Sequence, residues 1–408
     1  MSDKSNESKN KKFLSFFKDK IKEFKKSIGI VDKKEPISFE LSEFIQETES
    51  ALQELPQNYK NLYELKPAQE YFFVNRKNEI EKLEKSFTNW TKNRFVTCAL
   101  IAEKGSGVTS LLNNFLEKIP QIDTIRGEMH EKIYTKESYF EFFNSLLNTQ
   151  NITTNKELID FLNNSQSAKI IIIENLHHMF LKKVGGFESI KLLFELISYT
   201  TKKVLWIGNF TPETWSYLDK TISISNYFTS EIAMEELNHE IIKEILFRRN
   251  KYEDLTIEFI PQEDTLESKI FEKLDDDEKQ PYLEERFFKL LYKLSYGNIS
   301  LALLYWVRAI DKIDEQTIFV KEIEDLDYSF IKNLSAKSLF TLQALMLHDG
   351  LTLHDFAIVM NESSEECRKI LMPMLEKGLL IQPYKKYNIN PAIYKQVHNY
   401  LSSKNFIH

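Results

Sequence analysis

The fold is decided by one stretch of the chain, Val96-Thr97-Cys98-Ala99-Leu100-Ile101-Ala102-Glu103-Lys104-Gly105-Ser106-Gly107-Val108-Thr109-Ser110. An apolar, β-branched run at 96–102 leads into a loop with two glycines, and a helical pattern follows at 110–119. Glycine lets such a loop turn its backbone N–H groups inward, and the N-terminus of the next helix adds positive potential. A buried strand, a glycine loop and a helix in this order form a cradle for a phosphate chain.

The loop departs from the usual phosphate-binding pattern, G-x-x-x-x-G-K-[ST], at two positions. Ala102 stands where the pattern has its first glycine, and Val108 stands where it has lysine. Gly107 and Thr109 match the last glycine and the hydroxyl residue. Lys104 lies at a variable position of the loop, and we expect its side chain to point outward.

Apolar strands alternate with amphipathic helices on both sides of this stretch. Helices are predicted at 139–147 and 187–199, and further strands at 122–125, 170–173, 204–208 and 230–234. Continuous apolar strands between helices indicate a parallel sheet with both faces covered. The sequence therefore predicts an α/β fold for this region.

Composition restricts the class of protein. The chain has 408 residues, which is too long for one ordinary domain, and its net charge of −7 argues against a generally basic nucleic-acid coat. Its two cysteines, Cys98 and Cys367, cannot form a disulfide framework, which fits a reducing cytoplasm. It has no run of about 18 apolar residues that could span a bilayer. We expect a cytoplasmic protein.

Further motifs, in chain order, resemble those of the AAA+ and STAND group of P-loop ATPases, in particular the origin-recognition-like branch that carries a C-terminal winged helix. Phe73-Val74-Asn75-Arg76-Lys77-Asn78-Glu79-Ile80 resembles the box that precedes the first strand and lies near the adenine. Ile170-Ile171-Ile172-Ile173-Glu174-Asn175 resembles the Walker B strand. Val204-Leu205-Trp206-Ile207-Gly208-Asn209 resembles the sensor 1 strand, and Leu294-Ser295-Tyr296-Gly297-Asn298-Ile299-Ser300 the sensor 2 stretch of a helical lid.

This resemblance implies a P-loop NTPase core, and with it a set of ligands. ATP or ADP would be bound by the loop and the sensor asparagine, that is by Lys104, Gly105, Ser106, Gly107, Val108, Thr109 and Asn209. Mg²⁺ would be held by Thr109 and Glu174.

The departures from the family pattern all remove groups that stabilise the transition state. Val108 has no charge for the phosphates, Asn175 cannot act as a base, and Ser300 replaces the sensor 2 arginine. No arginine lies between Arg126 and Arg248, so the usual position of an arginine finger is empty. Since such groups are commonly worth about 10²–10⁵ in rate each, we expect nucleotide binding with little or no hydrolysis. Complete loss of binding and a working ATPase remain as alternatives.

Four regions are predicted along the chain: a basic amphipathic helix and linker at 1–37, the NTPase-like core at 38–235, a helical lid at 236–330 and a winged helix at 331–408. Within the lid, residues 252–285 carry thirteen acids against three lysines and are predicted to be a solvated insertion. Residues 286–312 are predicted to be helical.

The third helix of the predicted winged helix, at 363–377, is poorly suited to DNA. Three basic residues on it are balanced by three acids, so it would neutralise phosphate weakly. A winged helix that docks on protein is favoured over one that binds DNA. His177 and His178 follow the Walker B-like strand, and because adjacent side chains are expected to point to different faces, they are predicted to be core or surface residues and not ligands of one metal.

The N-terminal helix at 13–28 has two interpretations. Phe13, Phe17, Ile21 and Phe24 share one helical face that lysines flank. This face could lie in an anionic membrane surface, or it could dock against protein.

Together these patterns predict a regulatory or scaffold protein that binds nucleotide and acts through a protein partner, with self-association possible. The alternatives are a DNA-associated AAA+ ATPase, of the origin-recognition or transposition-helper type, and an adaptor on the inner face of the cytoplasmic membrane.

Overall fold

The computed structural model describes residues 55–407, apart from 64, 65, 69, 75, 253, 315 and 324–326. The predicted basic helix at 13–28 and the linker to residue 37 lie outside the described residues, as does the first part of the predicted core. Within the described ranges, no helix combines the length and the apolar character needed to cross a bilayer.

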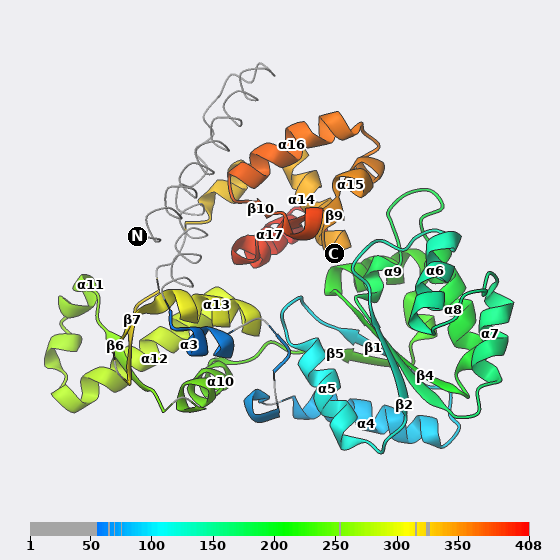
Figure 1. Cartoon of the computed structure of the whole chain (residues 1–408). Helices are drawn as coiled ribbons and strands as arrows, with labels where there is room; N and C mark the ends of the chain where they lie inside the picture. The colour runs from blue at the N-terminus through cyan, green and yellow to red at the C-terminus, as the bar shows by residue number, and fades with distance from the viewer. Residues whose placement is uncertain are drawn as a thin grey trace, which may run out of the picture. The chain divides into compact units, whose positions relative to one another are not determined.

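A five-stranded parallel sheet forms the centre of the α/β region (Figure 1). Its order is β2-β3-β4-β1-β5, from the strands β1 (Thr97–Ile101), β2 (Asp123–Glu128), β3 (Lys169–Glu174), β4 (Val204–Phe210) and β5 (Ser230–Ala233). The predicted α/β fold with a parallel sheet is confirmed. The four strands predicted beside β1 are found within a few residues of their expected bounds.

Helices cover both faces of this sheet, and alternate strand residues separate the two cores. Ile170 and Ile172 of β3 pack in one buried cluster with α4 (Lys77–Thr91) and α5 (Val108–Lys118). Ile171 and Ile173 pack in the other cluster, which includes residues of α6 (Lys136–Leu146), α7 (Asn155–Asn163), α8 (Glu188–Thr200) and α9 (Pro212–Ile222). This is the period of two that a strand imposes on its side chains. The sequence did not predict α7.

Cys98 belongs to the first of these clusters and is fully buried in β1. Burial raises the pKa of its thiol to about 11. The cysteine is therefore a small core residue, as the apolar run around it predicted.

The second region combines helices with a small sheet. α3 (Gln57–Leu62) is held to α10 (His239–Tyr252) and α13 (Ile299–Ala309) by buried hydrogen bonds, from Tyr59 to Asn250 and from Trp306 to Tyr59. The long helix α12 (Asp276–Ser295) packs beside α10 and α13. The sheet has the order β6-β8-β7, from β6 (Thr256–Ile260), β7 (Ile310–Asp314) and β8 (Thr317–Lys321).

The prediction of a solvated acidic insertion at 252–285 is wrong for β6. This strand pairs in parallel with β8, and Phe259 is only 4% exposed and lies against Phe287. The acids misled the prediction because they take the outward positions, as Glu258 does, while the apolar residue next to it points inward. The stretch predicted to be helical at 286–312 is divided between α12, which ends at Ser295, and α13 (Ile299–Ala309), and β7 begins at Ile310. Two short elements, α11 (Glu263–Leu266) and η4 (Phe271–Lys273), connect β6 to α12.

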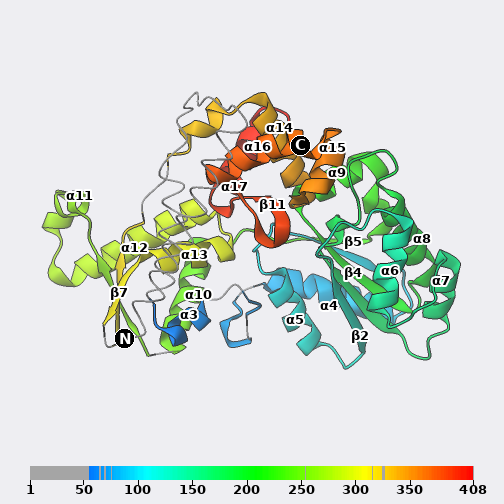
Figure 2. The ribbon, with the colours of Figure 1, turned by 45° about the horizontal axis from the view of Figure 1, so that its top comes forward.

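The C-terminal region has three helices, α14 (Ala336–His348), α15 (Leu353–Met360) and α16 (Ser364–Glu376), and an antiparallel sheet followed by α17 (Pro391–Ser403) (Figure 2). Its sheet has the order β10-β11-β9, from β9 (Leu351–Thr352), β10 (Leu380–Ile381) and β11 (Lys386–Ile389). Ser335, Thr352 and Ser363 cap the three helices by accepting a backbone N–H. The predicted third helix at 363–377 is present as α16, and Asp349, in the left-handed conformation, ends α14.

Candidate functional site

The loop between β1 and α5 is shaped by two glycines with positive φ, Gly105 (+81°) and Gly107 (+94°). Side chains rarely adopt this conformation, so the glycines allow the loop to turn. Gly107 is the N-cap of α5. Among the residues that the structure describes, none accepts a hydrogen bond from the backbone N–H of 105 or of 107–110. The first turn of a helix leaves such donors free for a ligand.

These residues line a cavity of about 280 Å³. Six of the seven predicted nucleotide-binding residues lie on its wall, namely Lys104, Gly105, Gly107, Val108, Thr109 and Asn209, and Ser106 does not. Other parts of the wall come from residues 66–68, from Ile299, Ser300 and Leu303, and from Asp349. The volume is near the lower end of the range of ligand pockets, about 300–1,000 Å³.

Thr109 and Glu174, the predicted Mg²⁺ ligands, are brought together at the end of β3. The Thr109 hydroxyl donates to Glu174 Oε2 at 2.6 Å. The other oxygen, Oε1, accepts from Arg126 Nε, also at 2.6 Å. A hydroxyl and a carboxylate suit Mg²⁺, but here a guanidinium already neutralises the carboxylate. A Mg²⁺ ion would have to displace Arg126 before it could bind the carboxylate of Glu174.

Sequence reasoning missed Arg126, which also donates to Asn113 of α5. It reaches Glu174 because β2 and β3 are neighbours in the sheet, with Arg126 opposite Ile172. A basic residue in the strand next to the Walker B-like strand was the only signal in the sequence.

Asn175 and Asn209 form the strand-end wall of the cavity. Asn209 Oδ1 accepts the backbone N–H of Asn175 at 2.7 Å, and Asn175 Nδ2 donates to Glu128 at 3.1 Å. Asn175 has a φ of +57°, a conformation that asparagine tolerates. The predicted sensor residue thus holds the turn after β3, and the amide of Asn175 offers no base to a water molecule.

The predicted sensor 2 stretch lies directly on the loop. Asn298 Nδ2 donates to the Lys104 carbonyl at 2.7 Å, and the Ser300 N–H donates to the Gly105 carbonyl at 3.1 Å. A Cβ on Gly105 would lie 2.8 Å from Ser300 Cβ, which is too close. The loop therefore needs glycine at 105 both for its backbone and for this contact.

Residues 73–80 support the loop from outside the cavity. Arg76 is buried and donates to the Ser106 carbonyl at 3.1 Å, while Glu79 pairs with it, also at 3.1 Å. The wall expected from this box is formed instead by 66–68, where the Ala68 N–H donates to Ser110 Oγ at 2.8 Å.

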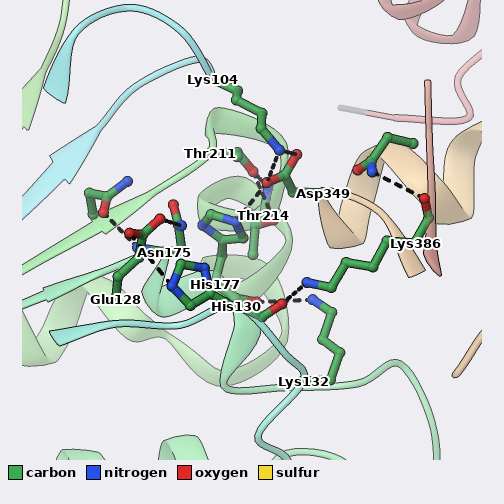
Figure 3. Close-up of polar contacts among 12 residues, drawn as sticks. Lys104, Glu128, His130, Lys132, Asn175, His177, Thr211, Thr214, Asp349 and Lys386 are labelled. Carbon is green, nitrogen blue, oxygen red and sulfur yellow. Dashed lines mark hydrogen bonds and ion pairs between the residues drawn. The ribbon is translucent and has the colours of Figure 1, made fainter. Parts of the chain in front are cut away.

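Two side chains of the loop reach the C-terminal region. Lys104 Nζ lies 3.1 Å from Asp349 Oδ2 (Figure 3), and Lys395 of α17 pairs with Glu103 at 2.7 Å. The Lys104 side chain is 70% exposed, so the outward direction predicted for it is confirmed. Burial alone would raise the pKa of the Asp349 carboxyl, but the His177 hydrogen bond and the Lys104 charge outweigh burial and hold this pKa well below its usual range.

His177 and His178 are buried in η2 (Leu176–His178), which follows β3. The prediction of different faces is wrong, because in this tight turn their ring centroids lie 4.6 Å apart. His177 Nε2 lies 3.4 Å from Asp349 Oδ2. Burial lowers the pKa of both imidazoles, so they are neutral. Their core position agrees with the prediction.

No family model matches the chain, and no curated protein does. Solved structures similar to it include the ORC1 protein of Aeropyrum pernix in complex with DNA, with 14% identity, a TM-score of 0.44 and coverage of 87% of this chain and 96% of that one. The Walker-type ATPase PABY2304 of Pyrococcus abyssi has 15% identity and a TM-score of 0.43, over 83% and 99%. The Holliday junction branch migration motor RuvB of Thermotoga maritima has 14% identity and a TM-score of 0.32, over 82% and 98%. These TM-scores are below 0.5, so the function proposed below rests on the residues of this chain.

Proposed function

We propose that this chain is a regulatory protein that binds ATP or ADP in the cavity at 102–110 and hydrolyses it slowly or not at all. The free backbone donors of Gly105, Gly107 and the first turn of α5 support binding, because they suit the oxygens of a phosphate chain. Val108 supplies no charge to that chain, which makes the affinity modest.

The observation that supports this proposal most strongly is that four consecutive loop residues, 103–106, form hydrogen bonds and ion pairs with other parts of the chain. Glu103 pairs with Lys395 of α17, and Lys104 with Asp349 at the end of α14. The carbonyls of 104 and 105 accept from the lid, at Asn298 and Ser300, and the carbonyl of 106 accepts from Arg76. A phosphate that moved this loop would alter contacts with both the lid and the C-terminal region.

Binding would therefore shift a conformational equilibrium, since a ligand acts on any contact that differs between the free and bound states. Lys104 is the side chain that we most expect to move when a phosphate binds. Its exposed ammonium could leave Asp349 for a phosphate, which would release the link to α14.

Slow hydrolysis follows from the other wall of the cavity. Asn175 has no basic oxygen for a water molecule, and Arg126 occupies the carboxylate of Glu174. If Mg²⁺ accompanies the nucleotide, the phosphates and Thr109 would hold it, with little help from Glu174.

The output would pass to a protein partner through the C-terminal region, which we interpret as a winged helix. On α16, Lys369 already pairs with Glu366 at 2.7 Å and Glu365 at 3.6 Å, so this helix offers DNA little net positive charge. DNA binding is the second candidate function, and we expect it to be weak. The cytoplasmic location, self-association and attachment to an anionic membrane by residues 13–28 stay predictions.

A titration of the full-length protein with a fluorescent ATP or ADP analogue, with and without Mg²⁺, tests the site. We expect saturable 1:1 binding that unlabelled nucleotide reverses. Hydrogen exchange at 336–403 tests the coupling, and nucleotide should change it in the wild type but less in the Lys104→Met variant, which still binds. Absence of saturable binding up to about 1 mM, a Kd that corresponds to only about 4 kcal/mol, would reject the proposal.

A further inference from the structure

We propose that His177, His178 and Asp349 form a binding site for one transition-metal ion of the Zn²⁺ or Co²⁺ class. This inference goes beyond the proposed function and does not depend on nucleotide binding. Each of the three residues offers one ligand atom, and these atoms all lie within 4.8 Å of one another. The two imidazoles come from η2, and the carboxylate comes from the end of α14.

One ligand–ligand distance already suits a tetrahedral site. Metal–ligand bonds of about 2.0–2.2 Å place neighbouring ligand atoms about 3.3–3.6 Å apart. His177 Nε2 and Asp349 Oδ2 are already 3.4 Å apart. The other ligand atoms lie within 4.8 Å of one another, so their distances must shorten by up to about 1.5 Å when a metal binds. Two imidazoles and one carboxylate suit Zn²⁺ and Co²⁺ and leave a fourth position open.

A second observation indicates that the site lacks a ligand. The Nδ1 atoms of both His177 and His178 are buried and have no hydrogen-bond partner. An unpaired buried polar atom costs about 1–3 kcal/mol. A metal bound through Nδ1 of His178 would give this buried atom a partner and would fix the orientation of the ring.

Three lysines lie around the site, and their hydrogen bonds show which ammonium group a metal must displace. Lys104 Nζ lies 3.1 Å from Asp349, and Lys132 and Lys386 are nearby. Lys132 donates to the carbonyl of His177 and Lys386 to that of His130, so neither hydrogen bond occupies the carboxylate (Figure 3). Of these three lysines, Lys104 is the one that pairs with the Asp349 carboxylate. Because its side chain is 70% exposed, its ammonium can move into water.

The site would link two segments that are 172 residues apart in sequence. A metal that binds the folded protein stabilises it by an amount that grows with its concentration relative to Kd. The ion would therefore stabilise the contact between η2 and the end of α14, where Thr214 also donates to the Leu347 carbonyl at 2.7 Å.

The test uses the metal-free full-length protein and Co²⁺, whose visible absorption bands report four-coordinate binding. We expect one Co²⁺ per chain, displacement by Zn²⁺ and a higher melting temperature with either ion. His178→Ala and Asp349→Asn should each weaken binding at least about 100-fold. His239→Ala is the matched control, since His239 lies in α10 and pairs with Glu240, and it should bind as the wild type does.

Lys104→Met separates a metal site from a merely structural cluster. Removal of the competing ammonium should strengthen Co²⁺ binding about tenfold or more, although it breaks the ion pair with Asp349. The proposal is overturned if the wild type binds no Co²⁺ at about 100 µM, or if His178→Ala binds as tightly as His239→Ala. It is also overturned if Lys104→Met binds no more tightly than the wild type, and this outcome does not require the His178 variant to fold.

Discussion

The two walls of the cavity differ in the chemical groups that they offer to a ligand. The loop wall, at 102–110, has two glycines, Gly105 and Gly107, free N–H groups and the hydroxyl of Thr109. The strand-end wall has an amide at Asn175, and Arg126 is paired with the carboxylate of Glu174. Main-chain donors depend only on the path of the backbone, whereas activation of water depends on particular side chains. We conclude that nucleotide binding and hydrolysis would depend on different residues and could be changed separately.

The largest effect is expected from closing the loop wall. Gly105→Ala introduces a Cβ that meets Ser300 at 2.8 Å, so the loop must shift and nucleotide binding should fall at least about tenfold. Gly185→Ala is the control, because Gly185 also has positive φ (+76°) but nothing within 4 Å of its Cβ. Both changes should cost roughly 1 kcal/mol from φ alone, measured by denaturant unfolding. Equal nucleotide affinity in the two variants would contradict this account of the loop.

Adding charge to the loop wall should have the next largest effect. Val108→Lys places an ammonium at the start of α5, where a charge-assisted hydrogen bond to phosphate is worth about 1.5–3 kcal/mol, or roughly 10- to 100-fold in Kd. Val184→Lys adds the same charge at a position that is 98% exposed and should leave Kd unchanged. Nucleotide titration compares them, and no gain for Val108→Lys would mean that phosphate does not lie at this loop.

Next to the strand-end wall, Arg126→Gln should free the carboxylate of Glu174. Binding of nucleotide should then become several-fold tighter in Mg²⁺ than in chelator, whereas the wild type should show little difference. Arg94→Gln, which removes an exposed arginine that bonds only to Asn89 among the described residues, is the control. If the wild type already depends strongly on Mg²⁺, Arg126 does not block the site.

The smallest effect is expected from Asn175→Asp. The left-handed backbone here accepts Asp, but one restored carboxylate cannot replace the missing charges, so phosphate release should stay far below about 1 s⁻¹ in both proteins. Turnover of about 1 s⁻¹ by the wild type, lost in Glu174→Gln, would show that the strand-end wall is catalytic after all.

The core of the fold could be predicted because its signals are local. β1, β3 and β4 are largely apolar runs, and such runs between amphipathic helices are typical of buried parallel strands. β6 could not be predicted in the same way. Its acids alternate with the residues that it buries, and the strand that stabilises it, β8, lies far along the chain.

The candidate site also has one part that the sequence predicts and one part that it does not. Glycine positions and the Thr109 hydroxyl can be read from one loop, so most predicted residues line one cavity. The contacts of Arg126 with Glu174, and of Lys104 and His177 with Asp349, join residues 48 to 245 positions apart. Spacing within a motif carries no information about such contacts. They depend on which strands are neighbours and on how the end of α14 meets the α/β core.

Because Cys98 is buried in β1, the rate at which its thiol is alkylated depends on how often this strand opens. A thiol with a pKa of about 11 and no access to solvent is alkylated only when the central sheet opens, because the thiolate is the reactive form. The labelling rate of this cysteine in native buffer would therefore report how often the strand beneath the loop separates from its neighbours. A ligand bound in the cavity, where β1 leads into the loop, should slow the alkylation of Cys98 in proportion to the fraction of protein that is occupied. The measurement needs neither a labelled ligand nor a tag on the protein.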